Sequence, residues 1–283
     1  MANRNFMEMV QKRWSQGKFV CVGLDSDIEK VREIVVFSKF VNYLNTIYQP
    51  MFWFNKAIIE NTKDLVCAYK PNVAFYESHG EEGWEALRET ILYIHKVAPE
   101  VPVILDAKRG DIGNTNAGYL EMAFRYSEAD AITLHPYLGQ ESLKPFLDLE
   151  DKGCIILCRT SNPGAGEFQD YGSPPLYQYV ARNVAEKWNK NGNCLIVVGA
   201  TYPGELRQIR KIVGDLPILI PGIGAQGGDL EKSVIFGKDS HNQGIIINSS
   251  RGIIFASKDS NFAEAAREET QKLNDQIVQY LQM

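Results

Sequence analysis

Eight short β-rich runs recur along the chain, and each is followed by a polar turn and a longer segment with helical periodicity. The runs are nearly continuous in apolar character, as in parallel strands that are covered on both faces. They are FVCVGLD (19–25), LVCAYK (65–70), VPVILDAK (101–108), AITLHPY (131–137), GCIILCRT (153–160), CLIVVGA (194–200), LPILIPG (216–222) and GIIINSS (244–250). Eight strand–helix units in about 250 residues are typical of a (β/α)8 TIM barrel, so the sequence predicts an α/β fold of this kind.

An open, doubly wound sheet is the alternative arrangement of such units. No GxGxxG follows the first run, which weakens a dinucleotide-binding interpretation. No repeat, low-complexity segment or linker divides the chain, so we expect a single barrel domain over residues 1–283. Residues at about 26–64, between the first two runs, are expected to form a helical elaboration of that domain.

The composition is that of a globular protein with a sizeable core, because 45% of the 283 residues are hydrophobic and 23% are charged. A net charge of −5 gives no support to nucleic acid or an anionic membrane as a partner. No apolar stretch reaches the roughly 18 residues of a membrane span, and the first residues lack a signal-peptide core. The five cysteines lie in or beside apolar runs and form no CxxC pair. We therefore expect reduced core thiols and a cytoplasmic location.

Polar residues stand at the ends of most predicted strands, where a barrel carries its catalytic groups. Asp106 and Lys108 have equal parity on the third strand, so their side chains project in the same direction. Lys70 ends the adjacent strand and Asp25 ends the strand before it, which gives a cluster with interleaved opposite charges. Such a cluster is either a structural ion-pair network or a site for chemistry. Its place at successive strand ends favours chemistry, because structural networks usually use exposed helix faces.

The loops after the seventh and eighth strands carry a second signal. Gly222, Gly224, Gly227 and Gly228 allow backbone N–H groups to approach an anion closely. Arg251 adds a fixed charge whose planar fork suits phosphate. Glycines also simply make turns, but barrels often hold a phosphate group at these two loops. Together the two loops indicate a phosphate site.

Two further features leave alternatives open. His135 precedes a proline at a strand end, where a histidine is either a base or a structural residue. The stretch SNPGAGEFQDYGSPP (161–175) is a long polar loop that either covers a site or is merely flexible. The remaining histidines lack metal-ligand spacing, so the sequence predicts no metal site.

The stretch DAKRGDIGNT (106–115) resembles the hallmark DxKxxDIxNT of the orotidine 5′-phosphate decarboxylase family. With YKPN (69–72) and TSNPG (160–164), its spelling resembles the branch often called type 2, and the similarity extends over essentially all eight strands. The resemblance implies a barrel carboxy-lyase that converts orotidine 5′-phosphate to UMP, the last step of de novo pyrimidine nucleotide synthesis. It also implies that the reaction needs no cofactor and no metal.

The resemblance further implies a role for each catalytic residue. Lys108 would deliver a proton to C6 of the pyrimidine, and Asp106 would lie against the substrate carboxylate. Asp25 and Lys70 would bind the ribose hydroxyls, and Lys70 would also join the charged network. Asp111 would reach across a homodimer interface into the partner's site, which makes it the fourth catalytic candidate.

Substrate-binding roles are implied at other strand ends and loops. Thr115 would accompany Asp111 into the partner's site, while Thr160 and Ser161 would contact the pyrimidine ring. The remaining substrate-binding candidates lie at strand ends or in the phosphate loops, and they are Asn72, Pro221, Gly222, Gly224, Gln226, Ser250 and Arg251. The segment GIGAQGGDLEKS (222–233) departs from the family pattern, because it is short and lacks the tyrosine that other branches use on the phosphate.

Two other functions remain possible at this stage. Sugar-phosphate enzymes of the same barrel superfamily, such as 3-keto-L-gulonate 6-phosphate decarboxylase and hexulose-phosphate synthase, share the Asp–x–Lys–x–x–Asp frame but use Mg²⁺. They need an acidic metal ligand on the second strand, where this chain has Lys70, whose ammonium repels a divalent cation. A non-catalytic barrel that only binds a nucleotide is the other alternative, but it has no need of a proton-donating lysine between two acids.

Overall fold

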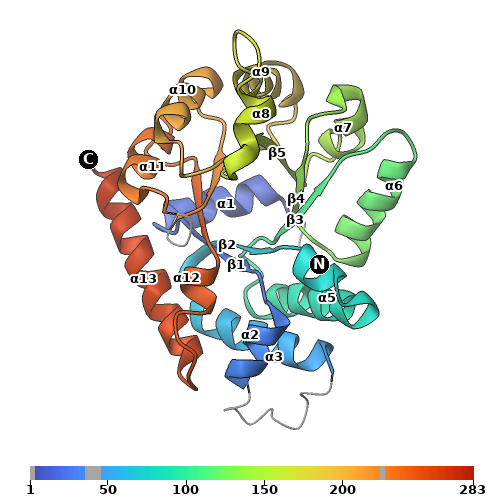
Figure 1. Cartoon of the computed structure of the whole chain (residues 1–283), viewed down its shortest axis with the longest axis vertical. Helices are drawn as coiled ribbons and strands as arrows, with labels where there is room; N and C mark the ends of the chain where they lie inside the picture. The colour runs from blue at the N-terminus through green and yellow to red at the C-terminus, as the bar shows by residue number, and fades with distance from the viewer. Residues whose placement is uncertain (1–3, 36–45, 224–226) are drawn as a thin grey trace.

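The computed structural model describes residues 4–35, 46–223 and 227–283, which form a barrel of eight parallel strands surrounded by helices (Figure 1). Each strand coincides with one of the eight predicted runs and differs from it only at its ends. The strands are β1 (Val20–Leu24), β2 (Val66–Pro71), β3 (Ile104–Arg109), β4 (Ala131–Leu134), β5 (Gly153–Arg159), β6 (Cys194–Val198), β7 (Ile218–Pro221) and β8 (Ile245–Ser249).

The strands close into a ring. Hydrogen-bonded neighbours follow the order β2-β1-β8-β7-β6-β5-β4-β3, and every pair is parallel. The two ends of this order, β2 and β3, are joined by the isolated parallel bridges Tyr69–Val103 and Asn72–Asp106. A doubly wound sheet would leave two open edges, so the closure confirms the barrel and excludes the open sheet.

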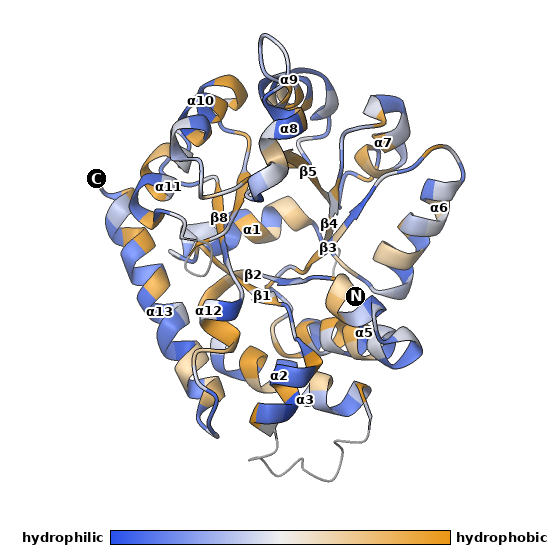
Figure 2. Ribbon diagram, viewed as in Figure 1, coloured by the Kyte–Doolittle hydropathy of each residue, from blue (hydrophilic) through white to orange (hydrophobic). Residues whose placement is uncertain are grey.

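The apolar runs become strands that are buried on both sides. Every residue of β1, β4, β6 and β8 is buried, as expected where helices cover the outside of a ring whose inside is filled by side chains. Figure 2 shows the strands as largely apolar and the surrounding helices as mixed in polarity. In α10 (Pro203–Val213), for example, the buried residues Leu206, Ile209 and Val213 recur at helical spacing and face the barrel.

Helices follow the strands around the outside of the ring. In the described residues the others are α1 (Phe6–Ser15), α2 (Ile28–Val35), α3 (Tyr48–Thr62), α4 (Ala74–Glu77), α5 (Gly80–Val97), α6 (Thr115–Leu120), α7 (Gly139–Leu147), α8 (Gly166–Gln169), α9 (Leu176–Asn183), α11 (Leu230–Gly237), α12 (Arg251–Ile254) and α13 (Phe262–Leu281). Helices α6 and α9 each continue as a π-helical turn, η2 (Glu121–Tyr126) and η4 (Val184–Trp188). Among all these helices, none combines the length and the apolar character needed to cross a membrane.

Helices α2 and α3 fall within the expected elaboration at about 26–64, of which residues 36–45 lie outside the described part of the chain. Helix α3 packs against α5 and α13 and buries apolar side chains such as Met51, Phe54 and Ile58. Its aromatic-rich sequence is therefore explained by contact with two neighbouring helices.

Helix α1 closes the amino-terminal end of the barrel. The Phe6 amide donates to the Asp151 carbonyl just before β5, at 3.0 Å. Arg13 Nε donates to the Val66 carbonyl at the start of β2, at 2.8 Å. The Phe6 ring fills the space beside Gly153, where a Cβ atom would lie only 2.4 Å from it. The carboxyl ends of the strands, at the opposite end, remain open to a ligand.

Candidate active site

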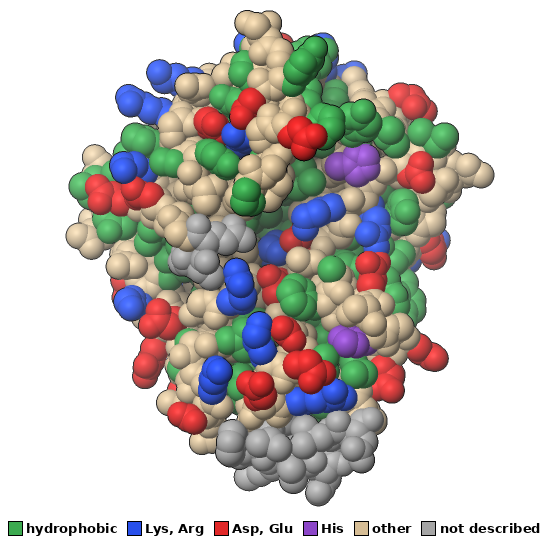
Figure 3. Space-filling model, viewed as in Figure 1, with side chains coloured by type: hydrophobic (Ala, Val, Ile, Leu, Met, Phe, Trp, Pro, Cys, Tyr) green, Lys and Arg blue, Asp and Glu red, His purple; other side chains and the backbone are tan. Residues whose placement is uncertain are grey.

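A cavity of about 680 Å³ opens at the carboxyl ends of the strands. Figure 3 shows acidic and basic side chains gathered around the hollow on this face. Most of the predicted site residues line it, namely Asp25, Lys70, Asn72, Asp106, Lys108, Thr160, Ser161, Pro221, Gly222, Ser250 and Arg251. Asp111 and Thr115 are not among its lining residues, and Gly224 and Gln226 lie outside the described residues.

Four charged side chains form one continuous set of contacts across β1, β2 and β3. Lys70 Nζ lies 2.7 Å from Asp106 Oδ2 and 4.0 Å from Asp25 Oδ1. Lys108 Nζ lies 2.6 Å from Asp106 Oδ1, to which Thr133 Oγ1 also donates at 2.9 Å. The side chain of Lys70 is 5% exposed and that of Lys108 is 49% exposed. Lys70 is therefore fixed in the wall, whereas Lys108 is free to reach a ligand.

Within this cluster, Lys70 and Asp106 each stabilise the charged form of the other. Burial disfavours the charged form of Lys70, but Asp106 and Asp25 outweigh it and raise the pKa of Lys70 well above its usual range. Burial also favours the neutral acid at Asp106, yet Lys70 and Lys108 hold the pKa of Asp106 well below its usual range. The neighbouring thiol behaves differently, because burial raises the pKa of Cys21 to about 12. Asp106 and Lys70 are thus charged at neutral pH, and Cys21 is not.

The backbone of β3 is irregular where it carries the catalytic candidates. The pairing of β3 with β4 changes register between Leu105 and Arg109. Lys108 has φ +49°, a region that residues other than glycine seldom adopt. The Lys108 amide donates to Thr133 Oγ1 at 2.9 Å, which holds this conformation. Bulges of this kind redirect side chains beside active sites, and here the bulge brings Lys108 over Asp106.

Asp25 is supported by a buried hydrogen-bond network that includes α3. The Leu24 carbonyl accepts from Tyr76 Oη at 2.9 Å, and Tyr76 Oη accepts from Asn55 Nδ2 at 3.0 Å. Ser26 Oγ donates to Asn55 Oδ1 at 2.5 Å. These contacts fix the chain on both sides of Asp25, whose Oδ1 is buried without a hydrogen-bond partner in the described structure. An acceptor held in this way suits a hydroxyl donor on a ligand.

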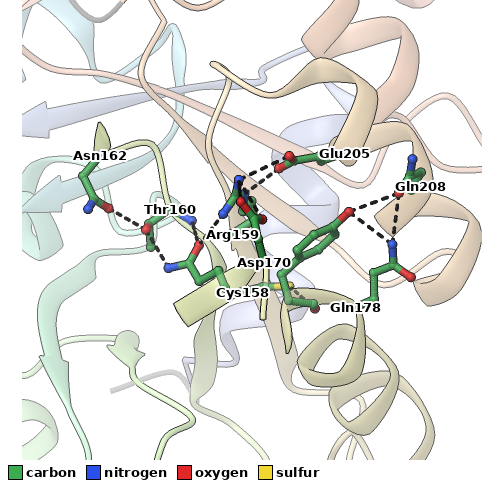
Figure 4. Close-up of polar contacts among 10 residues, drawn as sticks. Cys158, Arg159, Thr160, Asn162, Asp170, Gln178, Glu205 and Gln208 are labelled. Atoms are coloured by element: carbon green, nitrogen blue, oxygen red, sulfur yellow. Dashed lines mark hydrogen bonds and ion pairs between the residues drawn. The ribbon is translucent and has the colours of Figure 1, made fainter. Parts of the chain in front are cut away.

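The segment after β5 is more ordered than a merely flexible loop, since it contains a 3₁₀ turn, η3 (Pro163–Ala165), followed by α8. Figure 4 shows the contacts that Thr160 makes at its base. Thr160 Oγ1 donates to Asn162 Oδ1 at 2.6 Å and accepts from Gln169 Nε2 at 2.8 Å. The Thr160 hydroxyl thus already has partners within this segment. Ser161 and Asn162, which follow it, also line the cavity.

The loops after β7 and β8, where the sequence predicts a phosphate site, also border the cavity. Gly222 has φ +99°, a conformation that favours glycine, and it follows β7 directly. Ser250 and the exposed Arg251 follow β8 in the same way. Strand β1 approaches closely here, because a Cβ atom on Gly23 would lie 1.9 Å from Ser250 Oγ. The absence of a side chain at Gly23 therefore leaves room for Ser250 at the cavity edge.

Asp111 and Thr115 lie in a turn that leaves the barrel mouth. The Asp111 carbonyl accepts from both Asn116 Nδ2 and Ser142 Oγ, and the Asp111 amide donates to Asn116 Oδ1 at 2.9 Å. Next to Asp111, the side chain of Ile112 is 62% exposed. The backbone of Asp111 is thus firmly held, yet neither Asp111 nor Thr115 lines the cavity.

His135 makes a structural contact. Its Nε2 lies 2.7 Å from the Gly110 carbonyl, so it ties the end of β4 to the turn after β3. It does not line the cavity that holds Lys108. Of the two alternatives left open by the sequence, this geometry favours the structural one.

Five polar lining residues are not among the predicted site residues, namely Asp27, Lys30, Thr133, Asn162 and Asn248. Thr133 on β4 supports Asp106 and Lys108, as described above. Asn248 on β8 is 6% exposed, and its Oδ1 has no hydrogen-bond partner within the described residues. Thr133 and Asn248 both stand in buried apolar strands, where the sequence alone does not indicate whether a polar side chain faces inward or outward. Much of the remaining lining is apolar, including Leu157, Val197, Leu219 and Ile223.

Comparison with known proteins agrees with this geometry. A family model described as orotidine 5′-phosphate decarboxylase / HUMPS family matches residues 18–267. Orotidine 5′-phosphate decarboxylase from Cellvibrio japonicus is 46% identical over 278 residues, which are 96% of this chain and 98% of that protein. The corresponding protein from Ralstonia nicotianae is also 46% identical, over 97% of this chain and 98% of its own length.

A solved structure gives the same result at the level of the fold. The structure of Leishmania donovani OMP decarboxylase superimposes with a TM-score of 0.80 at 37% sequence identity. The alignment covers 96% of this chain and 99% of that one. From the barrel, the charged cluster at its mouth and these similarities, we conclude that the chain belongs to the orotidine 5′-phosphate decarboxylase / HUMPS family.

Proposed function

We propose that this protein decarboxylates orotidine 5′-phosphate to UMP without a cofactor, with Lys108 as the proton donor. The near full-length similarity to decarboxylases of that name supports the reaction. The observation that carries the mechanism is the contact of Lys108 with Asp106 at the mouth of the cavity, backed by the buried Lys70.

The residue types suit this reaction. Loss of CO₂ from C6 of the pyrimidine leaves a carbanion in the plane of the ring, with no adjacent group to delocalise the charge. Most decarboxylases rely on a cofactor to stabilise such charge. Here the ammonium of Lys108 stabilises it electrostatically, because it is already in position when the negative charge develops. The same ammonium then transfers a proton to C6, and the C6–H bond of UMP forms.

Asp106 contributes through repulsion that the reaction relieves. Two unit charges about 4 Å apart repel by about 4 kcal/mol at an effective dielectric constant of about 20. A substrate carboxylate beside Asp106 experiences this repulsion, which disappears when neutral CO₂ leaves. Contacts to the phosphate, made by Arg251 and the backbone after β7, offset the cost of binding. Asp25 and Asn72 fit the ribose, while Ser161 fits the pyrimidine.

The active form is proposed to be a homodimer in the cytoplasm. In it, Asp111 and Thr115 of one subunit complete the site of the other. This assignment is supported by the turn that holds the Asp111 backbone firmly while neither Asp111 nor Thr115 lines the cavity beside Lys108.

The Mg²⁺-dependent alternative is disfavoured by Lys70. Its ammonium lies 2.7 Å from Asp106 and 4.0 Å from Asp25, so it already neutralises the carboxylates that a metal would need. Activity should therefore persist in EDTA and show no response to added Mg²⁺. Loss of turnover in EDTA that Mg²⁺ restores would instead support the sugar-phosphate class.

The proposal is tested by replacing Lys108. Lys108→Ala should abolish turnover of orotidine 5′-phosphate, measured spectrophotometrically, while the melting temperature stays close to that of the parent. Lys144→Ala is the control, since the exposed Lys144 side chain pairs with the exposed Asp148 at the end of α7 and does not line the cavity. Turnover within tenfold of the parent in the Lys108 variant would overturn the mechanism.

A further inference from the structure

The segment after β5 begins at Thr160, and the side chain of Gln169 holds this residue in place. Gln169 Oε1 accepts from the Thr160 amide at 3.0 Å, and Gln169 Nε2 donates to Thr160 Oγ1 at 2.8 Å. Thr160 in turn donates to Asn162. The carboxamide of Gln169 therefore fixes both the backbone and the side chain of Thr160, which immediately precedes the cavity-lining Ser161.

Gln169 is itself in contact with Arg159 at the end of β5. Figure 4 shows Arg159 together with its partners Glu205 and Asp170. The Arg159 side chain is 3% exposed and makes two contacts with Glu205 of α10, at 2.5 and 3.2 Å. Nη2, one of the two nitrogens that contact Glu205, also lies 3.1 Å from Asp170, and Nη1 lies 3.5 Å from Gln169 Oε1. The guanidinium also lies 4.3 Å from the centre of the Tyr202 ring, a favourable cation–π distance. This buried charge thus connects the segment after β5 to the helix after β6.

The segment held by Gln169 lies between two cavities. Leu157 and Thr160 line both the catalytic cavity and a neighbouring, more apolar groove of about 810 Å³, to which Phe168, Gln169 and other residues belong. Thr160 is therefore part of the wall between them, and Gln169 supports that wall from the groove side. Loss of this support would let the wall move and admit water near the reacting groups, where exclusion of water strengthens electrostatic contacts.

We propose that Gln169 and Arg159 are positioning residues for the pyrimidine end of the active site. Gln169 fixes Thr160, and Arg159, held by Glu205, fixes Gln169, so that Ser161 and Asn162 present their polar groups to the base in one defined arrangement. Neither Gln169 nor Arg159 touches the substrate. The inference rests on the proposed function, because it assigns the base to this part of the cavity and the phosphate to the loops after β7 and β8.

The test compares two glutamines of the same region. Gln169→Leu keeps the approximate size of the side chain but removes both contacts to Thr160. Gln178→Leu is the matched control, since within the described part of the chain the Gln178 side chain bonds to Tyr177 and Gln208 and does not line the catalytic cavity. Loss of two hydrogen bonds should lower kcat/KM of the Gln169 variant roughly 10- to 100-fold, whereas the control stays within about twofold of the parent.

Ligand binding distinguishes a role of Gln169 in positioning the pyrimidine end of the site from a general loss of structure. Gln169→Leu should weaken binding of UMP, while binding of ribose 5-phosphate, which lacks the base, stays as in the parent. Glu205→Gln removes the charge that anchors Arg159. It should also weaken binding of UMP relative to binding of ribose 5-phosphate, but by a smaller factor. Equal losses for both ligands, or equal effects of the Gln169 and Gln178 variants, would overturn the proposal. Failure of the parent itself to turn over orotidine 5′-phosphate would count against the proposed function instead, and the comparison of the two ligands would still be informative.

Discussion

At the scale of single residues, the site depends on groups whose charge or polarity is fixed before a ligand arrives. Lys70 is the clearest example, because burial alone would favour its neutral form and two carboxylates reverse that preference. A lysine whose pKa is raised on folding contributes stability at every pH below its unfolded pKa, and this contribution is lost as the pH rises through the folded pKa. The largest opposing influence on Lys70 is Asp106, so the pair can be tested by removing that partner.

Asp106→Asn should destabilise the protein at neutral pH by roughly 3 kcal/mol, because it leaves a buried ammonium without its main counter-charge. Burial is already the largest single influence on the pKa of Lys70, and without Asp106 the main group left to oppose it is Asp25, so the pKa of Lys70 falls below the unfolded value. The variant's penalty should accordingly shrink as the pH is raised from about 7 to about 10, since neutral Lys70 carries no penalty. Melting temperatures across this range measure the difference between variant and parent. Asp64→Asn, which breaks an exposed pair with Arg267, should show a small and pH-independent difference.

Asn248 illustrates the opposite arrangement, a polar group left without a partner in the described residues of the free protein. Asn248→Leu should raise the free energy of unfolding by about 1 kcal/mol, since it replaces a buried unpaired carboxamide with an apolar side chain of similar size. The same variant should bind UMP roughly tenfold more weakly, because a ligand contact is lost. Asn193→Leu is the control, for the buried Asn193 donates to three backbone carbonyls and its replacement should destabilise the fold. Unchanged affinity in the Asn248 variant would remove Asn248 from the binding site.

At the scale of elements, the contact between β1 and the end of β8 sets the shape of the cavity edge where we propose that the phosphate binds. The space above Gly23 is occupied by Ser250, whose Cα lies 3.3 Å from the position of a Cβ atom on Gly23. Any side chain on β1 at this point must therefore displace the backbone that leads into Arg251. The close approach of the two strands is thus a condition for the geometry of the phosphate loop.

Gly23→Ala should weaken binding of UMP roughly tenfold and leave the weaker binding of uridine unchanged, because only the phosphate contacts are displaced. Gly204→Ala is the matched control, since the position of a Cβ atom on Gly204 in α10 is free of neighbours within 4 Å. Calorimetric titration of both ligands against both variants gives the comparison. A parallel loss of uridine binding in Gly23→Ala would show that the disturbance extends beyond the phosphate.

The strands could be predicted from the sequence because burial on both faces requires continuous apolar runs, and such runs are visible without a structure. The charged cluster could also be predicted, because Lys70, Asp106 and Lys108 stand at strand ends that a barrel brings together. Thr133 could not, since one threonine within an apolar run is equally compatible with an inward or an outward side chain. The contact of Gln169 with Thr160 was beyond reach as well, because it depends on how η3 and α8 turn the chain back.

At the scale of the whole molecule, the proposed dimer makes each site a product of two chains. The firmly held turn at Asp111 is useful to catalysis only if a second subunit receives it. This can be examined with two inactive variants, Lys108→Ala and Asp111→Ala. In a mixed dimer, one site collects both defects and the other has neither.

Mixing the two variants and allowing subunit exchange should restore about a quarter of the parent activity, because random pairing makes about half of the dimers mixed and each has one intact site. Activity after mixing, with each variant alone as the baseline, is the measurement. If Asp111 served its own subunit, every site would keep a defect and mixing would restore nothing. A monomer in analytical ultracentrifugation would contradict the proposal independently.

The join between β2 and β3 bears on how the enzyme loses activity when it is heated or denatured. Other neighbouring strands share ladders, whereas this pair is joined by two isolated bridges, and the two lysines of the charged cluster stand on its two sides. Partial opening at the join separates Lys70 from Asp106 while the rest of the ring keeps its hydrogen bonds. Such openings require less energy than global unfolding. We therefore expect heat or denaturant to abolish activity before the fold as a whole unfolds, which parallel measurements of turnover and circular dichroism would show.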